Sequence, residues 1–146
     1  SAGPLAQRKG LTFENELRVV EDENTRPAIL FGDRMLVQQA MENLVSNAVK
    51  YTETGWIRIA SSSENGRYHF SVTDTGVGIA ADELPHVFES FFRADQGSNK
   101  PLQSGVGLGL SLVKNVVKKH GGDVWVESEK DQGSTFGFWL PLADLP

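Results

Sequence analysis

The spacing of apolar residues predicts which segments of this chain are strands and which are helices. Residues 11–20 alternate between apolar and polar side chains, and residues 28–31 form a short apolar run, so the chain is expected to open with two strands. Asp33 then precedes an apolar stripe of helical spacing that reaches Val49, which predicts a long amphipathic helix with Asp33 at its N-cap. The chain therefore begins with β-structure followed by one long helix.

Two strand hairpins are predicted in the rest of the chain. Residues 56–62 and 68–74 alternate on either side of the turn sequence Glu64-Asn65-Gly66, which favours an antiparallel pair. Residues 124–127 and 135–140 predict a second, closing hairpin. Strands are thus expected both before and after the long helix in the sequence.

The region between the two hairpins has a different composition. Residues 75–104 are rich in Gly, Asp, Ser and Pro around an aromatic patch, so a long mobile loop with one short helix is expected there. Residues 108–119 carry a second helical stripe that ends at Gly121-Gly122, a pair that stops helices. Helices and strands in this order indicate an α+β fold of two layers.

Composition narrows the classes of partner. The chain has 146 residues, which suits one domain, and a net charge of −5 with scattered basic residues, which argues against DNA and RNA. It has no cysteine, so a disulfide framework and a thiolate metal site are excluded. No apolar run approaches the roughly 20 residues of a membrane-spanning helix, and we therefore expect a soluble fragment.

A polar line runs along the long predicted helix beside its apolar stripe. Gln39, Asn43, Asn47 and Lys50 are spaced four, four and three residues apart, which places them on one helix face. Carboxamide oxygens are hard neutral ligands for Mg²⁺, and an ammonium group supplies positive charge to phosphate oxygens. The line suits a magnesium-bound triphosphate, although a solvated helix face gives the same pattern.

A carboxylate stands at the end of the first predicted hairpin. The sequence there is Asp74-Thr75-Gly76-Val77-Gly78-Ile79, in which two glycines allow close backbone approach. Asp74 could accept a hydrogen bond from the amino group of adenine, and a buried carboxylate at a strand end needs such a partner. A cap or an ordinary turn would satisfy it as well.

A glycine-rich stretch opens the second predicted helix. Its sequence is Ser104-Gly105-Val106-Gly107-Leu108-Gly109-Leu110. Free amide groups and the positive end of the helix dipole favour phosphate at such an N-terminus, and a flexible hinge is the alternative. The dinucleotide fingerprint is excluded because glycine recurs at every second position after a loop, and the P-loop because Gly-Lys-Ser/Thr is absent.

Taken in this order, the motifs resemble the sequence boxes of one family over nearly the whole chain. Residues 43–52, NLVSNAVKYT, resemble the N box of the histidine-kinase branch of the GHKL ATP-binding superfamily, and residues 74–79 resemble its G1 box. Residues 88–93, FESFFR, resemble the F box, and residues 105–110, GVGLGL, the G2 box. Residues 133–141, GSTFGFWLP, are similar to the usual close of the domain.

The resemblance implies a two-layer sandwich of the GHKL (Bergerat) type, a mixed and mostly antiparallel sheet packed on about three helices, with ATP under a flexible lid. Asn43, Asn47, Lys50 and Arg93 would be catalytic, with Asn47 as the Mg²⁺ ligand. Asp74 would accept from adenine directly and through a water that Thr135 also holds. The other nucleotide contacts implied are Tyr51, Gly76, Gly78, Ile79, Phe88, Gly105, Val106, Gly107, Leu108 and Gly109.

Two departures and one ambiguity accompany the resemblance. Phe92 stands where many members have Tyr, and Val106 where many have Thr or Ser, so any hydroxyl contact from those side chains is absent. The backbone contacts to phosphate do not depend on these side chains. Phe88 is either an anchor of the lid or a core residue, since aromatic side chains serve both purposes.

The implied activity is transfer of the γ-phosphate of ATP to a histidine on a separate dimerisation domain, in two-component signalling. His69, His86 and His120 do not resemble the phosphoacceptor of the family, so the acceptor is expected on another domain. Residues 6–11, AQRKGL, resemble the link from a preceding helical dimerisation domain, so residues 1–10 are expected to be a linker from a missing upstream domain and residues 11–146 the catalytic domain. The implied partners are that domain and a response regulator, in the cytoplasm. The chain itself would be a monomer, and its parent kinase would be a homodimer. The chain would bind ATP but show little kinase activity by itself.

Individual residues distinguish this chain from three alternative classes of protein. A gyrase-like or chaperone-like ATPase has Glu in the first N-box position, where this chain has Asn43, and Asn cannot act as a general base. Glu42 is one residue off and would point about 100° around the helix. The F box argues against a serine-directed anti-sigma kinase, and Asn47, Lys50 and Asp74 argue against a degenerate binding module.

Overall fold

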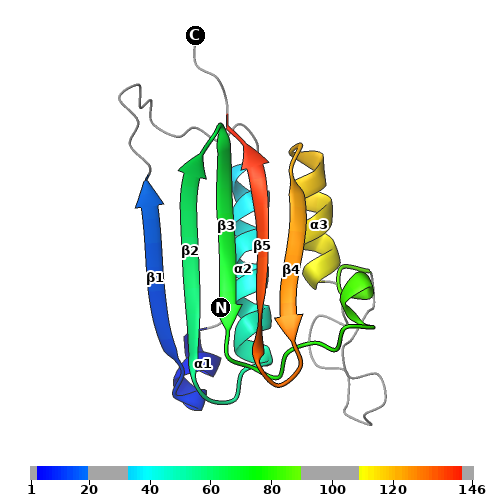
Figure 1. The fold of residues 1–146 in the computed structure, drawn as a ribbon. Helices are drawn as coiled ribbons and strands as arrows, with labels where there is room; N and C mark the ends of the chain where they lie inside the picture. The colour runs from blue at the N-terminus through cyan, green and yellow to red at the C-terminus, as the bar shows by residue number, and fades with distance from the viewer. Residues whose placement is uncertain (1–2, 20–32, 90–108, 143–146) are drawn as a thin grey trace.

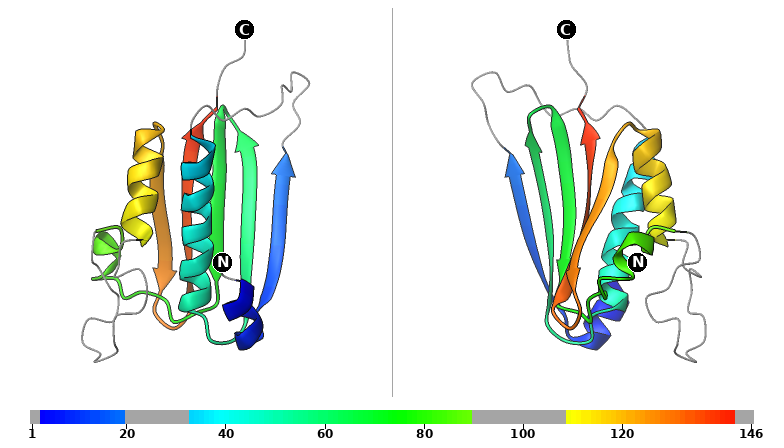
Figure 2. Two further views of the ribbon diagram at one scale, coloured as in Figure 1. Left: turned by 180° about the vertical axis from the view of Figure 1, so that it is seen from behind. Right: turned by 45° about the vertical axis from the view of Figure 1, so that its right-hand side comes forward.

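The computed structural model describes residues 3–19, 33–89 and 109–142 as two layers, a five-stranded sheet with helices on one face (Figure 1, Figure 2). Its strands are β1 (Thr12–Val19), β2 (Trp56–Glu64), β3 (Arg67–Asp74), β4 (Asp123–Glu129) and β5 (Gly133–Pro141). Its helices are α1 (Gly3–Lys9), α2 (Arg34–Lys50), α3 (Gly109–Lys119) and the 3-10 helix η1 (Leu84–His86). The predicted α+β class with two layers is confirmed.

The sheet is mixed, as predicted. Its strand order is β1-β2-β3-β5-β4, in which β1 and β2 are parallel and the other neighbours are antiparallel. Both hairpins are present, and β2 turns into β3 at Asn65 and Gly66, whose φ angles are +53° and +74°. Asn-Gly is the pair that favours such a turn. The strand predicted at residues 28–31 lies outside the described residues.

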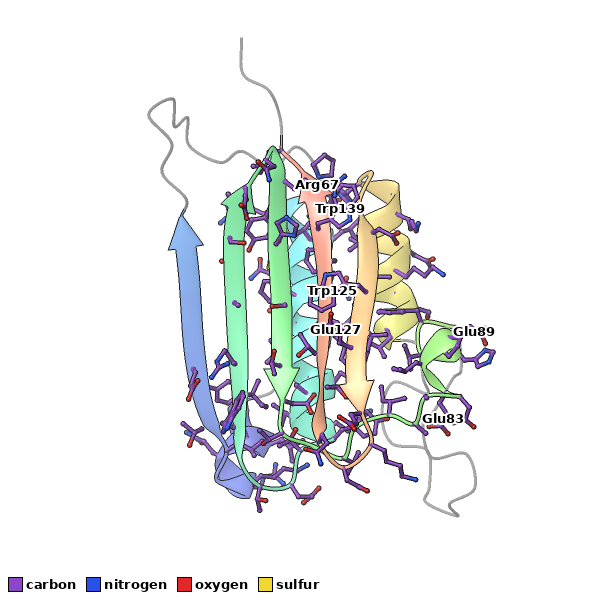
Figure 3. The ribbon with its side chains drawn as sticks, in the orientation of Figure 1. Arg67, Glu83, Glu89, Trp125, Glu127 and Trp139 are labelled. Carbon is purple, nitrogen blue, oxygen red and sulfur yellow. The ribbon has the colours of Figure 1, made fainter. Side chains whose placement is uncertain are left out.

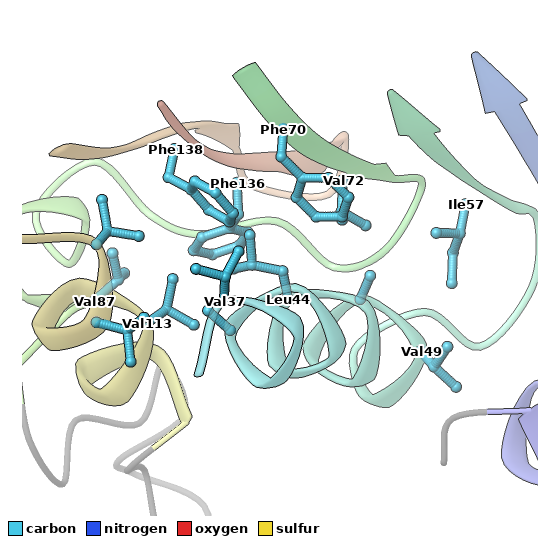
Figure 4. Packing of buried hydrophobic residues seen from close by; sticks show 14 of the residues in the cluster. Val37, Leu44, Val49, Ile57, Phe70, Val72, Val87, Val113, Phe136 and Phe138 are labelled. Carbon is cyan, nitrogen blue, oxygen red and sulfur yellow. The ribbon is translucent and has the colours of Figure 1, made fainter. Parts of the chain in front are cut away.

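Helix α2 forms where the apolar stripe predicted it. The Asp33 carboxylate accepts hydrogen bonds from the backbone N–H groups of Met35 and Leu36, at 3.0 and 3.1 Å, and thereby caps the helix. The stripe packs toward the sheet, with Leu44 and Val49 each at most 1% exposed (Figure 4). Within the described residues, no helix has the length and hydropathy needed to cross a bilayer.

Alternation along the strands separates a helix-facing side of the sheet from an open side. Phe70, Val72, Phe136 and Phe138 point toward the helices and are at most 6% exposed, and the rings of Phe70 and Phe138 pack with centroids 5.4 Å apart (Figure 4). Successive side chains of a strand point to opposite faces. The residues between these four therefore lie on the open face of the sheet.

All three tryptophans of the chain lie on that open face. The Arg67 guanidinium stacks over the Trp139 ring at 3.7 Å (Figure 3), and the Arg58 guanidinium lies 4.6 Å from the Trp56 ring. Trp125 lies across from residue 137, where any side chain would overlap the indole, and this position is a glycine. The open face is thus lined by aromatic rings and guanidinium groups.

Candidate functional site

The end of the N-box helix, the start of the G1 box and Gly109 lie at one end of the two layers. In Figure 1 the chain runs downward along α2 and upward along α3, as the colours show. The last turn of α2 and the first turn of α3 therefore lie at the same end. Strand β3 also ends there, at Asp74. The backbone N–H of Val77 donates to the Tyr51 carbonyl at 3.2 Å, which joins the turn after Asp74 to the end of α2.

The polar line of α2 is partly enclosed. Asn43, Asn47 and Lys50 are half-buried, whereas Gln39, one turn earlier, is exposed. Asn43 and Asn47 are four residues apart, so their carboxamides lie on the same side of the helix. The part of the line from Asn43 to Lys50 is therefore partly enclosed, and the interpretation of a solvated face fits only Gln39.

Asp74 is 4% exposed and is held by two backbone amides. Its Oδ1 atom accepts from the N–H of Gly76 at 2.9 Å and from the N–H of Ser134 at 3.2 Å. Burial raises the pKa of Asp74 above its usual value, and the two amide hydrogen bonds oppose this rise. The predicted turn thus uses Oδ1, and no hydrogen bond joins Oδ2 to any of the described residues.

The turn after Asp74 packs closely because it contains glycine. A side chain at Gly76 would overlap the carbonyl oxygen of Tyr51, and a side chain at Gly78, whose φ is +67°, would overlap the carbonyl oxygen of Glu129. The backbone of this turn is therefore pressed between the end of α2 and the end of β4.

Gly78→Ala is expected to destabilise the domain by about 2 kcal/mol more than Gly66→Ala. Both glycines have φ near +70°, so both substitutions carry the cost of a left-handed alanine. At Gly78 the new Cβ would meet a backbone carbonyl, whereas, apart from its neighbours in the chain, none of the described residues lies within 4 Å of a Cβ at Gly66. Denaturant unfolding of the two variants measures the difference, and equal losses would contradict the close packing against Glu129.

Thr135 does not reach Asp74. It pairs with Thr73 across the strands, and the two hydroxyl oxygens lie 2.9 Å apart on the open face of the sheet. Asp74 pairs instead with Ser134, on the side that faces the helices. The sequence assigned a contact near Asp74 to Thr135. In the structure, the residue that contacts Asp74 is Ser134, which directly precedes Thr135.

Ser134 is the residue that the sequence reasoning missed. Its side chain is 7% exposed, and its Oγ lies 2.7 Å from the Oγ of Ser128, which accepts from the N–H of Ile79 at 2.8 Å. The two serines therefore tie β4 and β5 to the turn after Asp74. Alternation would have revealed Ser134, because it has the same parity as the buried Phe136 and Phe138.

The remaining site residues are only partly described. Phe88 packs edge-on against Phe136, with centroids 6.0 Å apart, and this contact favours a core position for its ring. Gly109 begins α3, and, apart from its neighbours in the chain, none of the described residues lies within 4 Å of where its Cβ would be. The expected lid lies outside the described residues, together with Arg93, Gly105, Val106, Gly107 and Leu108.

Comparison with known proteins identifies one family. Histidine kinase-, DNA gyrase B-, and HSP90-like ATPases match residues 32–144. The chain is 38% identical to the autoinducer 2 sensor kinase/phosphatase LuxQ of Vibrio parahaemolyticus, over 97% of this chain and 16% of that protein. It is 40% identical to the sensor histidine kinase RcsC of Escherichia coli K12, over 80% of this chain and 12% of that protein. The chain thus spans less than a fifth of the length of these relatives.

Solved structures share the fold. Full-length ShkA in complex with AMPPNP superposes with a TM-score of 0.76 at 34% identity, over 97% of this chain and 28% of that chain. The catalytic domain of the histidine kinase ThkA, in a nucleotide-free form, gives a TM-score of 0.72 at 29% identity, over 95% of this chain and 84% of that chain. The predicted type of sandwich is confirmed by these structures.

Proposed function

Because the chain belongs to the family of histidine kinase-, DNA gyrase B- and HSP90-like ATPases and is a catalytic domain of the histidine-kinase type, we propose that it binds Mg-ATP and donates the γ-phosphate to a histidine on a separate dimerisation domain. The observation that carries this proposal is the buried Asp74 carboxylate, whose Oδ1 is held by two amides beside the end of α2. Such a group recognises a ligand amine.

Asp74 is the proposed acceptor for the adenine amino group. Its Oδ2 would receive the amine directly, while Gly76, Gly78 and Ile79 shape the pocket around the base. Tyr51 would flank the nucleotide, since its backbone carbonyl already contacts the turn at Val77. A buried carboxylate whose partner is missing is destabilising, so this site is expected to prefer adenine to guanine.

The phosphates are proposed to lie along α2 toward the start of α3. The described residues contain no cluster of three or more His, Cys, Asp or Glu that could hold a metal by itself. The half-buried carboxamides of Asn43 and Asn47 fit a magnesium ion that shares its ligands with phosphate, because neutral oxygens add no charge repulsion. When bound, Mg²⁺ would neutralise phosphate charge, and Asn47 would hold it.

Further positive groups complete the proposed phosphate site. Lys50 would contact phosphate from the last turn of α2, and Arg93 would reach the γ-phosphate. The backbone of Gly105, Gly107 and Gly109 would supply amides to the phosphates, with Leu108 closing the site. Catalysis would then consist mainly of positioning and charge neutralisation.

Hydrolysis of ATP by this chain is not favoured. Water activation requires a general base, and residue 43 is an asparagine, which cannot accept a proton. Glu42 is exposed on the outer side of α2, away from the half-buried Asn43 and Asn47. A transferase therefore fits the residues better than an ATPase of the gyrase or chaperone type.

The acceptor histidine is proposed to come from another domain. His69 lies within β3 and His86 within η1. His120 uses both ring nitrogens, since Nδ1 lies 2.7 Å from the Val116 carbonyl and Nε2 accepts from the N–H of Asp33 at 3.0 Å. The partners proposed are a dimerisation domain of the same kinase and a response regulator, in a homodimeric and cytoplasmic arrangement.

Phosphotransfer to a supplied acceptor tests this function. The chain is mixed with a separately produced dimerisation domain from the same kinase and with ATP labelled in the γ-phosphate, with or without Mg²⁺. We expect labelled acceptor only when chain, acceptor and Mg²⁺ are all present, and little label on the chain itself. An absence of ATP binding in the presence of Mg²⁺ would instead favour a degenerate binding module.

A further inference from the structure

Helix α1 is attached to the end of α2 that carries the site (Figure 1). Its Ala6 is 2% exposed, and the helix is followed by Gly10, whose φ is +70°. The N–H of Leu11 donates to the Ala6 carbonyl and the N–H of Gly10 to the Gln7 carbonyl, both at 3.1 Å, which is a complete Schellman ending. The entry of the chain is therefore a defined part of the domain.

Lys9, the last residue of α1, reaches across to α2. Its Nζ donates to the carbonyl oxygens of Val49 at 2.9 Å and Lys50 at 3.1 Å, and lies 3.0 Å from Oε1 of Glu53. An ammonium group has three N–H donors, so all of them are used. The Lys9 side chain is 15% exposed.

The Lys9 ammonium group lies where a positive charge stabilises the C-terminal end of α2. The last carbonyl groups of a helix lack partners within the helix, and a positive charge near them also complements the helix dipole. Lys9 supplies both effects to the turn that contains Lys50. Removing it would take the ammonium donor from both carbonyls, of which that of Val49 also accepts from the N–H of Thr52 at 3.5 Å.

A short series of contacts connects that turn to Asp74. Tyr51 follows Lys50 directly, and its carbonyl accepts from the N–H of Val77 at 3.2 Å. The N–H of the preceding residue, Gly76, donates to Asp74 Oδ1. The two carbonyls that Lys9 binds are therefore separated from the buried carboxylate by only two hydrogen-bonded steps.

We propose that Lys9 is a positioning residue that fixes the last turn of α2 against the turn after Asp74, and so couples the placement of α1 to nucleotide affinity. The coupling rests on the proposed function, because it concerns the same nucleotide site. Coupling between two sites is reciprocal. A bound nucleotide should therefore hold α1 more firmly in place, and displacement of α1 should weaken nucleotide binding.

Substitution of Lys9 tests the coupling, with its neighbour as a matched control. Lys9→Met keeps much of the apolar stem and removes the ammonium group, whereas Arg8→Met removes an equal charge from an exposed position of the same helix. ATP affinity is measured by calorimetry at a temperature where every variant is folded. We expect Lys9→Met to weaken binding about 5-fold or more, and Arg8→Met and Glu53→Gln to leave it within about 2-fold because Glu53 is largely exposed.

Amide exchange without nucleotide separates this coupling from the proposed function. In Lys9→Met, but not in Arg8→Met, the N–H of Val77 should exchange faster, because the Tyr51 carbonyl that it binds is no longer fixed. Should the parent chain fail to bind ATP, the proposed function fails while this exchange difference still decides whether the contact series operates. Unchanged exchange at Val77, or a lower stability with unchanged ATP affinity, would overturn the positioning role.

If Lys9→Met does not fold, neither its ATP affinity nor its Val77 exchange can be compared with the parent, and a second substitution covers that case. Lys9→Gln keeps an N–H donor without the charge, and should give a smaller loss of ATP affinity than Lys9→Met and a smaller rise in Val77 exchange. Binding equal to that of the parent, with unchanged Val77 exchange, would overturn the role here as well.

Discussion

Replacing Asp74 with asparagine is expected to lower the affinity for ATP about 1,000-fold while the domain stays folded. Asparagine keeps one oxygen to accept from the N–H groups of Gly76 and Ser134. Its amide NH₂ group then takes the place of Oδ2 and faces the adenine amine. Both groups are hydrogen-bond donors, so no hydrogen bond can form between them. The loss corresponds to about 4 kcal/mol, and calorimetric titration with ATP and with GTP measures it.

Thr135→Val is the matched control for this substitution. Thr135 bonds to Thr73 on the open face of the sheet, so its loss should leave ATP affinity unchanged. An Asp74→Asn variant that binds ATP and GTP as the parent does would show that Asp74 does not contact the base. A Thr135→Val variant that loses affinity would contradict the placement of Ser134 beside the carboxylate.

The stability of the asparagine variant follows from the pKa of Asp74. Burial raises that pKa in the folded state, so the stability that protonated Asp74 contributes is complete below the unfolded value, near 3.8, and is lost as the pH rises through the folded value. Asparagine cannot ionise. Denaturant unfolding should therefore find the variant at least as stable as the parent at pH 7, with the difference shrinking as the pH falls toward 3.8.

Asn47→Ala is expected to abolish the effect of Mg²⁺ on ATP affinity and to lower phosphotransfer on the order of 100- to 1,000-fold. Asn47 is half-buried on α2, and alanine is the better helix former, so the fold should persist. ATP affinity with Mg²⁺ and with a chelator, together with label transfer to the supplied acceptor, measures the two effects.

Gln39→Ala provides the comparison on the same polar line. Gln39 is exposed two turns before Asn47, so its removal should change neither ATP affinity nor transfer. A Gln39→Ala variant as inactive as Asn47→Ala would indicate that the whole line, and not its enclosed part, binds the ligand. A magnesium effect that survives in Asn47→Ala would show that the metal has another ligand.

Local patterns predicted most of the fold. The N-cap at Asp33 and the turn at Asn65-Gly66 depend on residues next to one another in sequence, and both were read correctly. The parallel pairing of β1 with β2 was not predicted, because the two strands are separated by α2 and only packing brings them together. Seven-residue α1 was expected as part of a linker, since a helix this short depends on its contacts with the domain.

The candidate site likewise contains residues that local sequence patterns predict and residues that they do not. Asn43, Asn47 and Asp74 are predicted from their helical spacing and from the end of a strand, and the structure brings the end of α2 and the end of β3 to one end of the layers. Lys9 was not found, because its acceptors are backbone carbonyls about 40 residues away, which no sequence pattern marks. Ser134 was missed although the alternation of β5 identifies it.

The placement of Trp56, Trp125 and Trp139 decides how ligand binding can be observed in this chain. All three indoles lie on the side of the sheet away from α2 and from the Asp74 carboxylate. Their emission spectrum therefore reports the integrity of the strands and is shielded from a ligand by the thickness of the sheet. Intrinsic fluorescence suits unfolding experiments on every variant above, while titrations need calorimetry or an extrinsic dye.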